Sequence, residues 1–269
     1  MNEEALFTPA RYELLEKIYS YYTHPQYISP DPLQMLFNYR ERRDIEVVVL
    51  ISASFAYGRV AAILSTLNFI FEVLMPAPCK YLLKSSKEEL AEKFAGFKYR
   101  FTTDTELVDM LYAIKCILEK FDTLENCFLS VLEPSEPDYS SAMKRFSALI
   151  YEYGAFSGKS SLIPMPQLSS ASKRLAMFLR WMIRHDEVDL GLWDRCNPKA
   201  LIVPLDTHMH SVAKRLGFTK SKTGSMRTAQ EITHGFALFS PEDPVKYDFA
   251  LTRSGIRGED DVESLLAAW

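Results

Sequence analysis

The sequence predicts an all-α protein, and two observations carry this prediction. Only ten of the 269 residues are glycine, and apolar residues recur three and four positions apart over most of the chain. Prolines, serines and glycines gather between these periodic stretches, where helices would stop. Apolar residues make up 48% of the chain and charged residues 25%, which is typical of a globular protein with a sizeable core. We place a lobe boundary at Pro134-Ser-Glu-Pro137-Asp, which divides the chain into residues 1–137 and 138–269.

Six helical segments are expected in the first lobe. Their predicted ranges are residues 9–22, 33–39, 45–74, 88–94, 105–120 and 124–132. The third is the most apolar part of the chain; Asp44 is expected to cap it, and a break is expected at Tyr57-Gly58-Arg59. Because Arg59 and Glu72 interrupt this segment, its uncharged halves are too short to cross a bilayer. The segment therefore predicts two buried helices.

Five helices are expected in the second lobe, separated by polar loops. Four of them are predicted at residues 140–151, 173–184, 228–239 and 244–254, and the fifth follows Asp206. Loops are predicted at residues 157–172, 186–198 and 219–227, of which the last is basic. The helices of this lobe show apolar residues at helical spacing, as Leu175, Phe178, Leu179 and Met182 do.

The stretch from Pro204 to Gly217, PLDTHMHSVAKRLG, combines a helix start with groups capable of chemistry. Asp206 or Thr207 suits the N-cap, because a side-chain oxygen there accepts an otherwise unpaired backbone N–H. Gly217 can take the left-handed conformation that ends helices. A carboxylate is thus expected at the positive end of a helix, within one turn of two histidines. From spacing alone, a plain N-cap explains Asp206.

The string LDTHMHSVAKRLG resembles the V-D-T-H-V-x-R-V-x-x-R-L-G element of the helix-hairpin-helix DNA glycosylases. That superfamily includes endonuclease III, the adenine glycosylase MutY and 8-oxoguanine glycosylases. The resemblance implies two helical lobes that flank a cleft, in which a damaged base is flipped out of duplex DNA. It further implies that Asp206 stabilises the positive charge built on the sugar or activates the nucleophile. As a whole, with PLDTH followed by DPVKYDFAL, the chain also resembles a bacterial family of unknown function.

The resemblance also implies a phosphate-binding hairpin upstream of Asp206, built in that family on an L-P-G-V-G turn. The corresponding stretch here begins at Leu168 and lacks both glycines, so its serines and the following arginine are the candidate phosphate ligands: Ser169, Ser170, Ser172 and Arg174. Lys173 follows the turn where bifunctional members place a catalytic lysine, whose amine attacks C1′ of the sugar to give a Schiff base. If the alignment slips by one residue, Arg174 takes that position and cannot do this chemistry. An ordinary surface lysine is the alternative.

Two further features bear on DNA binding. By resemblance, the break near residue 58 is where a wedge would fill the gap left by the flipped base, with Tyr57 stacking and Arg59 reaching the orphaned base. A core tyrosine and a solvated arginine are the alternative there. Residues 170–228 contain eleven Lys and Arg against five Asp and Glu, although the net charge of the chain is −4. This segment, with Lys214 and Arg215, is expected to contact phosphates, although a solvated helical surface would show the same bias.

No metal or other cofactor is expected. The D-x-H-x-H string at Asp206, His208 and His210 also begins some metal-dependent hydrolases, but residues two apart on a helix face different ways. Only 59 residues follow His210, too few for the barrel of those enzymes. The four cysteines lack a C-x-x-C pair and none follows Cys196, which argues against an iron–sulfur cluster. Reduced thiols and an acidic N-terminus without an apolar leader are typical of a cytoplasmic protein.

These observations lead to two hypotheses about function. In the first, the chain is a base-excision DNA glycosylase, with or without AP-lyase activity, that acts on duplex DNA containing a damaged base. Asp206 and Lys173 are then its catalytic residues. In the second, it is a non-catalytic helical DNA-binding protein of the same fold. The two differ in whether Asp206 is needed for chemistry or only for stability.

Overall fold

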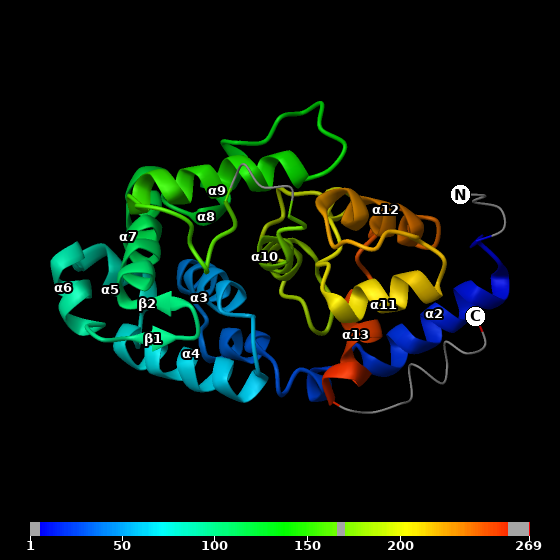
Figure 1. The fold of residues 1–269 in the computed structure, drawn as a ribbon, viewed down its shortest axis with the longest axis horizontal. Coiled ribbons are helices and arrows are strands. Elements are labelled where there is room, and N and C mark those ends of the chain that lie inside the picture. The colour runs from blue at the N-terminus through cyan, green and yellow to red at the C-terminus, as the bar shows by residue number, and fades with distance from the viewer. Residues whose placement is uncertain (1–5, 166–169, 258–268) are drawn as a thin grey trace. The chain divides into compact units, whose positions relative to one another are not determined.

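The computed structural model describes residues 6–165, 170–257 and 269, with the side chains of residues 254–257 left out. These residues form an all-α protein, as predicted (Figure 1). The only strands among them are β1 (Lys98–Tyr99) and β2 (Thr102–Thr103), which pair in one antiparallel hairpin. The sequence did not predict this hairpin, because two residues per strand are too few to show alternation.

The chain folds into two compact units that interleave along the sequence. Unit 1 comprises residues 1–29, 137–139 and 169–269, and unit 2 comprises residues 30–136 and 140–168. The expected division, by contrast, was into two contiguous lobes. The helix at residues 9–22 belongs to unit 1 because it packs against the helix at residues 248–257. The helix that starts at Ser140 belongs to unit 2 because it packs along the longest helix of that unit.

Unit 2 is built around one buried helix. Its elements are η2 (Pro32–Asn38), α3 (Arg42–Ser54), α4 (Val60–Leu74), α5 (Pro78–Lys84), α6 (Lys87–Lys93), the β1–β2 hairpin, α7 (Asp104–Phe121), α8 (Leu124–Leu129) and α9 (Ser140–Gly154). Every residue of α3 from Asp44 to Ser54 is buried, and η2, α5 and α8 pack around it. Glu41, not Asp44, occupies the N-cap of α3. Asp44 instead accepts the backbone N–H of Cys79 at 2.8 Å and so fixes the start of α5.

The long apolar segment breaks between α3 and α4, as predicted. Gly58 lies at the break with φ of +104°, where a β-carbon would stand 2.8 Å from both Arg100 Nη1 and Tyr99 Oη. Glycine is therefore required there by conformation and by space.

No single helix in the described part of the chain is long and apolar enough to cross a membrane. The helices α4 and α5 reach that length and composition only when counted together, and they are bent by 60° at the break between them.

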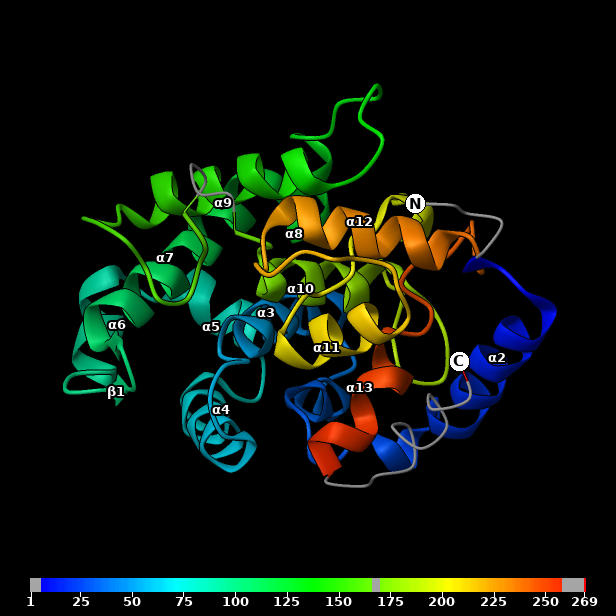
Figure 2. The same ribbon diagram turned by 45° about the vertical axis from the view of Figure 1, so that its right-hand side comes forward.

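Unit 1 is also organised around a buried helix. Its elements are α2 (Pro9–Tyr22), η1 (Pro25–Tyr27), α10 (Lys173–Ile183), η3 (Pro198–Ala200), α11 (Thr207–Arg215), α12 (Met226–Ala237) and α13 (Asp248–Arg257). From Leu175 onward α10 is buried at every position except Met177. The helix α11 lies beside α13 (Figures 1 and 2). Because α10 is apolar on nearly all sides, other elements of the unit must pack against it on all sides.

Part of that cover comes from the polar loop after α10. Gly191 and Trp193 donate their backbone N–H groups to the carbonyls of Trp181 and Met182, at 3.3 and 2.7 Å. The indole of Trp193 packs edge-on against Phe178, with 5.2 Å between ring centroids. These hydrogen bonds satisfy carbonyls at the end of α10 that have no partner within the helix. The loop thereby places the carboxylates of Asp186 and Asp189 next to arginines of α10 and its C-cap.

Candidate functional site

The two residues predicted to be catalytic meet in unit 1. The Nζ atom of Lys173 lies 3.1 Å from Oδ2 of Asp206, and the two side chains are 32% and 26% exposed. Lys173 is the first residue of α10, and Asp206 immediately precedes α11. Two helix starts thus hold the pair at the surface of the unit, where a ligand can reach it.

Asp206 uses its two carboxylate oxygens for different purposes. Oδ1 accepts the backbone N–H of Met209 at 2.9 Å, which makes Asp206 the N-cap of α11. Oδ2 faces Lys173. The N-cap role expected from spacing alone therefore leaves one oxygen for chemistry, and the positive end of α11 stabilises the carboxylate anion.

The residue before α10 has the left-handed backbone conformation that glycine usually adopts, although it is a serine. Ser172 has φ of 49° and ψ of 39°, the left-handed region that L-residues enter at a cost of about 1–2 kcal/mol. Its hydroxyl does not cap the helix and instead donates to the carbonyl of Ser170 at 3.4 Å. Ser170 is exposed and forms an isolated bridge with Ser225. Ser169, a further predicted phosphate ligand, lies outside the described residues.

Among the described residues, no helix lies directly before the stretch where the resemblance implies a phosphate-binding hairpin. Helix α9 ends at Gly154, and the described residues between it and α10 contain no helix. The chain instead runs back along α9, held by the hydroxyls of Ser147 and Tyr151, which donate to the carbonyls of Pro164 and Ile163. These side chains hold the backbone in the loop that was predicted at residues 157–172. The serine-rich stretch is thus a loop that enters one helix.

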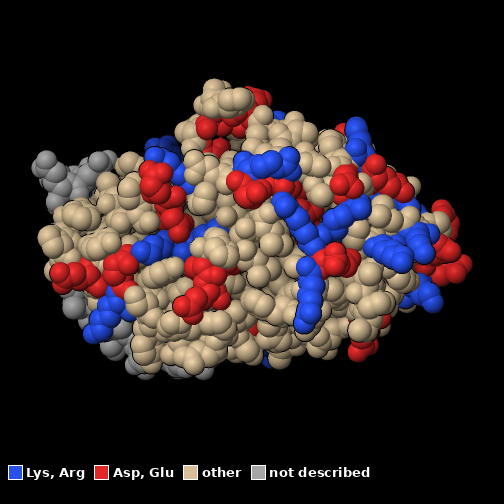
Figure 3. Space-filling model, turned by 180° about the vertical axis from the view of Figure 1, so that it is seen from behind, with Lys and Arg blue, Asp and Glu red and all other residues tan. Residues whose placement is uncertain are grey.

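The predicted basic segment is only in part a basic surface. Lys214 and Arg215 are exposed in the last turn of α11, and Arg174 is half-buried. Arg180 and Arg184 are buried. On the face in Figure 3, the described basic and acidic side chains are mixed, and neither sign forms a continuous field there.

Both buried arginines belong to one ion-pair network in unit 1. Arg180 pairs with Asp189 at 3.1 Å and with Asp248, and Arg184 pairs with Asp189 at 3.0 Å. Asp186 and Asp243 complete the shell of Arg184. Burial raises the pKa of Asp248 to about 6, although the neighbouring Arg180 lowers it, and the charge of Asp206 adds to the rise. The charge of Asp206 therefore acts on the pKa of Asp248, a member of this network.

The DPVKYDFAL motif supplies part of this network. Its two aspartates are the partners Asp243 and Asp248, and its lysine and tyrosine bind a residue of α2. Lys246 Nζ lies 2.7 Å from Glu16 Oε1, and the hydroxyl of Tyr247 donates to the same oxygen at 2.6 Å. The motif therefore ties α2, α10 and α13 together. The network was not predicted; two arginines four residues apart in an otherwise apolar helix were the signal that could have revealed it.

The predicted wedge residues lie in unit 2 and differ in their surroundings. Tyr57 is half-buried; its hydroxyl lies 2.5 Å from Thr102 Oγ1, and its ring packs edge-on against Tyr99 with 5.1 Å between centroids. Arg59 is exposed at the start of α4. Tyr57 therefore supports the β1–β2 hairpin, and Arg59 is the more accessible of the two.

The histidines of the D-x-H-x-H string point to different surroundings. His208 is exposed, whereas Nε2 of His210 lies 3.1 Å from the carbonyl oxygen of Ser221. Across the described residues, no group of three or more His, Cys, Asp or Glu side chains is placed to hold a metal ion. The geometry gives the metal-hydrolase alternative no support.

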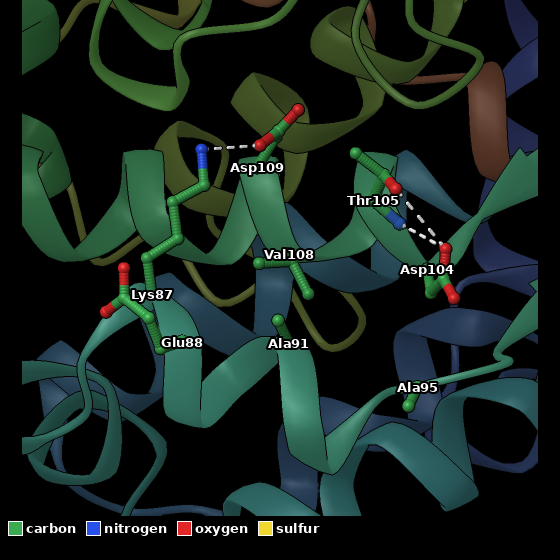
Figure 4. Close-up of a pocket in the computed structure, with 8 residues that line it drawn as sticks. All are labelled: Lys87, Glu88, Ala91, Ala95, Asp104, Thr105, Val108 and Asp109. Carbon is green, nitrogen blue, oxygen red and sulfur yellow. Dashed lines mark hydrogen bonds and ion pairs between the residues drawn. The ribbon is translucent and has the colours of Figure 1, made fainter.

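A pocket of about 330 Å³ lies in unit 2, between α6 and α7. Figure 4 shows Lys87 of α6 reaching to Asp109 of α7, with Ala91 and Val108 nearby. Lys87 Nζ is 2.7 Å from Asp109 Oδ1 and also donates to the carbonyl of Gly154 at 3.1 Å. Lys87 and Asp109 are therefore engaged in holding helices of unit 2 together. None of the predicted site residues lines this pocket.

Comparison with known proteins places the chain in a family. Residues 31–257 match the family described as protein of unknown function (DUF2400), and the chain belongs to that family. The matched region contains Lys173, Asp206 and the DPVKYDFAL motif. No curated protein and no solved structure matches the chain.

Proposed function

We propose that this protein is a DNA glycosylase that removes a damaged base, with an AP-lyase step carried out by the same site. The observation that carries the proposal is the 3.1 Å contact between Lys173 Nζ and Asp206 Oδ2. The resemblance singled out the two residues in two different stretches of the sequence, and they lie at the starts of two different helices. An amine beside a carboxylate is the pair that this chemistry requires.

Asp206 acts on the sugar. As the C1′–N bond of the damaged nucleotide lengthens, its electron pair leaves with the base and positive charge builds on the sugar. A carboxylate held by a backbone N–H and a helix start stabilises that charge without having to reorganise. The N-cap hydrogen bond from Met209 to Oδ1 fixes the direction of Oδ2. Asp206 is thus positioned by the fold, not by the substrate.

Lys173 supplies the nucleophile. It must lose a proton before it attacks; Oδ2 of Asp206 is within hydrogen-bond distance to take this proton and pass it to the departing base, so that Asp206 is again an anion as charge builds on the sugar. The neutral amine then bonds to C1′ as the base departs, and opening of the sugar ring gives a Schiff base. Removal of a C2′ proton expels the 3′ phosphate, and water releases the lysine. Each step exchanges protons and electron pairs only, so no redox partner is needed.

Duplex DNA is the proposed partner. Exposed cations of unit 1 that are suited to phosphates follow the site in sequence: Lys214, Arg215, Lys220, Lys222 and Arg227. Ser170 is exposed beside the entry into α10 and can donate to a phosphate. Phosphate contacts of this kind fix orientation and make binding dependent on salt.

The proposal is tested on end-labelled duplexes that each carry one lesion: 8-oxoguanine, uracil, hypoxanthine, an alkylated purine or thymine glycol. Each is incubated with and without borohydride, which reduces a Schiff base to a stable adduct. We expect base release by the wild type, loss of release in Asp206→Asn, and loss of the trapped adduct in Lys173→Gln. Lys199→Gln is the matched control, because Lys199 forms an exposed ion pair with Glu242 at 2.8 Å. That variant should keep both activities.

A second candidate function is a helical DNA-binding protein without catalysis. Two observations favour it: Asp206 has a structural role as the N-cap of α11, and the described residues between α9 and α10 contain no helix. Under this hypothesis, no lesion is released while duplex DNA is still bound in a salt-sensitive way. That combination of results would reject the glycosylase and retain DNA as the partner.

A further inference from the structure

The β1–β2 hairpin of unit 2 presents an exposed aromatic ring on a two-residue turn. Tyr99 pairs with Thr102, so Arg100 and Phe101 alone connect the strands. Arg100 is in the left-handed region with φ of 52°. Phe101 is 74% exposed, the highest value among the large apolar side chains in the described part of the chain. The exposed ring is available to contact a partner, and burying it there would gain hydration free energy.

Hydrogen bonds from Tyr57 and Ser161 hold the two strands of the hairpin in place. Tyr99 donates its hydroxyl to the carbonyl of Tyr57 at 2.5 Å, and Tyr57 Oη lies 2.5 Å from Thr102 Oγ1. Thr102 Oγ1 in turn lies 2.6 Å from the hydroxyl of Ser161. Thr102 and Tyr99 are buried. These hydrogen bonds fix the strands on either side of the turn, so the position of the turn that carries Phe101 is set before a partner binds.

One cation lies over the exposed ring, and two further exposed cations belong to the hairpin and to the start of α4. The guanidinium of Arg100 lies 5.6 Å from the ring centroid of Phe101 and 5.8 Å from that of Tyr57. Lys98 and Arg59 are exposed. Arg59 follows Gly58, over which the Arg100 side chain lies. Lys98, Arg100 and Arg59 form no ion pair with the described residues, so their charges face solvent.

The nearby carboxylates are occupied by backbone groups. Asp104 accepts the N–H of Gly96 at 2.8 Å, which lowers the pKa of Asp104. Glu106 accepts the N–H groups of Thr103 and Ser161 at 3.1 and 2.6 Å. These carboxylates cap α7 and close the turn. Asp104 and Glu106 remain anionic at the base of the hairpin, whereas the turn residues Arg100 and Phe101 carry one positive charge and no negative charge.

We propose that this hairpin tip contacts nucleic acid, with Phe101 stacking on an unpaired base and Lys98, Arg100 and Arg59 contacting the phosphates. An aromatic face next to several cations is the combination that binds a strand with unstacked bases, because every base offers a π-face and every nucleotide a negative charge. The inference takes DNA as the polymer from the proposed function. It assigns the stacking role to Phe101, because Tyr57 is engaged in supporting the hairpin.

The test uses the full chain and a fluorescent duplex that contains one tetrahydrofuran abasic analogue, beside the same duplex intact. Stacking of an aromatic ring on a base contributes about 1–3 kcal/mol, which corresponds to about 5- to 150-fold in affinity. We expect Phe101→Ala to weaken binding of the abasic duplex by at least about fivefold, with a smaller change for the intact duplex. Phe101→Tyr should restore the preference for the abasic duplex. Phe37→Ala is the matched control, because Phe37 is 52% exposed in η2 of the same unit.

Two results would overturn the inference. The first is an abasic preference in Phe101→Ala equal to that of the wild type. The second is the absence of any nucleic-acid binding by the wild type, which would leave the exposed ring to a protein partner. Because tetrahydrofuran has no glycosidic bond, neither result depends on catalysis. Loss of the abasic preference in Phe101→Ala would support the hairpin contact even if no lesion were released and the glycosylase proposal failed.

Discussion

Charged side chains at the two ends of α10 differ in their exposure to solvent. At its start, Lys173 pairs with Asp206 while both side chains remain partly exposed. Near its end, Arg180 and Arg184 are buried and contact several carboxylates each. A buried charge is tolerated only when its partners satisfy it, whereas an exposed pair retains hydrogen-bonding capacity for a ligand. The buried end therefore supports the fold, and the exposed end is the one for which we propose chemistry.

The largest expected effect comes from breaking the buried end. In Arg180→Met, Asp189 and Asp248 lose a shared cation in a site from which water is excluded. Asp189 keeps its ion pair with Arg184, but Asp248 loses its cation, and a buried carboxylate left unpaired typically costs about 3–5 kcal/mol of unfolding free energy. Chemical denaturation monitored by circular dichroism measures this loss. A loss below about 1 kcal/mol would show that the two ends of α10 do not differ as the structure indicates.

The pH dependence of stability sharpens the same comparison. Burial raises the pKa of Asp248 from 3.8 to about 6, so the folded state binds this proton more tightly than the unfolded state does. The contribution of Asp248 to stability is therefore greatest below pH 4 and falls as the pH rises through 6. One proton corresponds to a slope of at most about 1.4 kcal/mol per pH unit.

Two measurements check this sign. The unfolding free energy of the wild type should fall more steeply, or rise less, than that of Asp248→Asn between pH 4 and 6. In the wild type, the ¹³C shift of the Asp248 carboxyl should have its midpoint near pH 6. Equal slopes, with a midpoint near the ordinary value of 3.8, would contradict the prediction.

The helical elements could be predicted from the sequence because their signals are local. The range expected for the first helix, 9–22, is that of α2, and the break at Gly58 was expected from its flanking residues. The β1–β2 hairpin and the interleaving of the units were not predicted. Two-residue strands carry no periodicity, and the packing of α2 on α13 joins the two ends of the chain.

The candidate site shows the same limit. Asp206 and Lys173 could be proposed because each lies in a recognisable stretch, but their 3.1 Å contact depends on the tertiary structure. The positive charge of residues 170–228 overestimated the basic surface, because Arg180 and Arg184 are buried against carboxylates. Composition counts charges, but it does not tell which of them face solvent.

A smaller effect is expected at the entry into α10. Ser172→Gly places the residue that tolerates positive φ where serine now has φ of 49°. The relief of backbone strain should exceed the added freedom of the unfolded chain and increase stability by about 0.5–1 kcal/mol. Thermal unfolding measures the gain. Ser170→Gly is the control, because residue 170 is not at positive φ and should gain nothing.

The smallest change in stability is expected at the exposed end itself. Lys173→Met removes a partly exposed ion pair, and Asp206→Asn keeps an N-cap side chain able to accept the N–H of Met209. Each should cost less than about 1 kcal/mol in a denaturant titration. Asp206→Ala loses the cap as well and should cost about 1 kcal/mol more than Asp206→Asn. Because the charge of Asp206 helps to raise the pKa of Asp248, Asp206→Asn should also shift the ¹³C midpoint of Asp248 to lower pH. A large stability loss in Lys173→Met would place this pair in the frame with the arginines and remove the reason to treat it as a site.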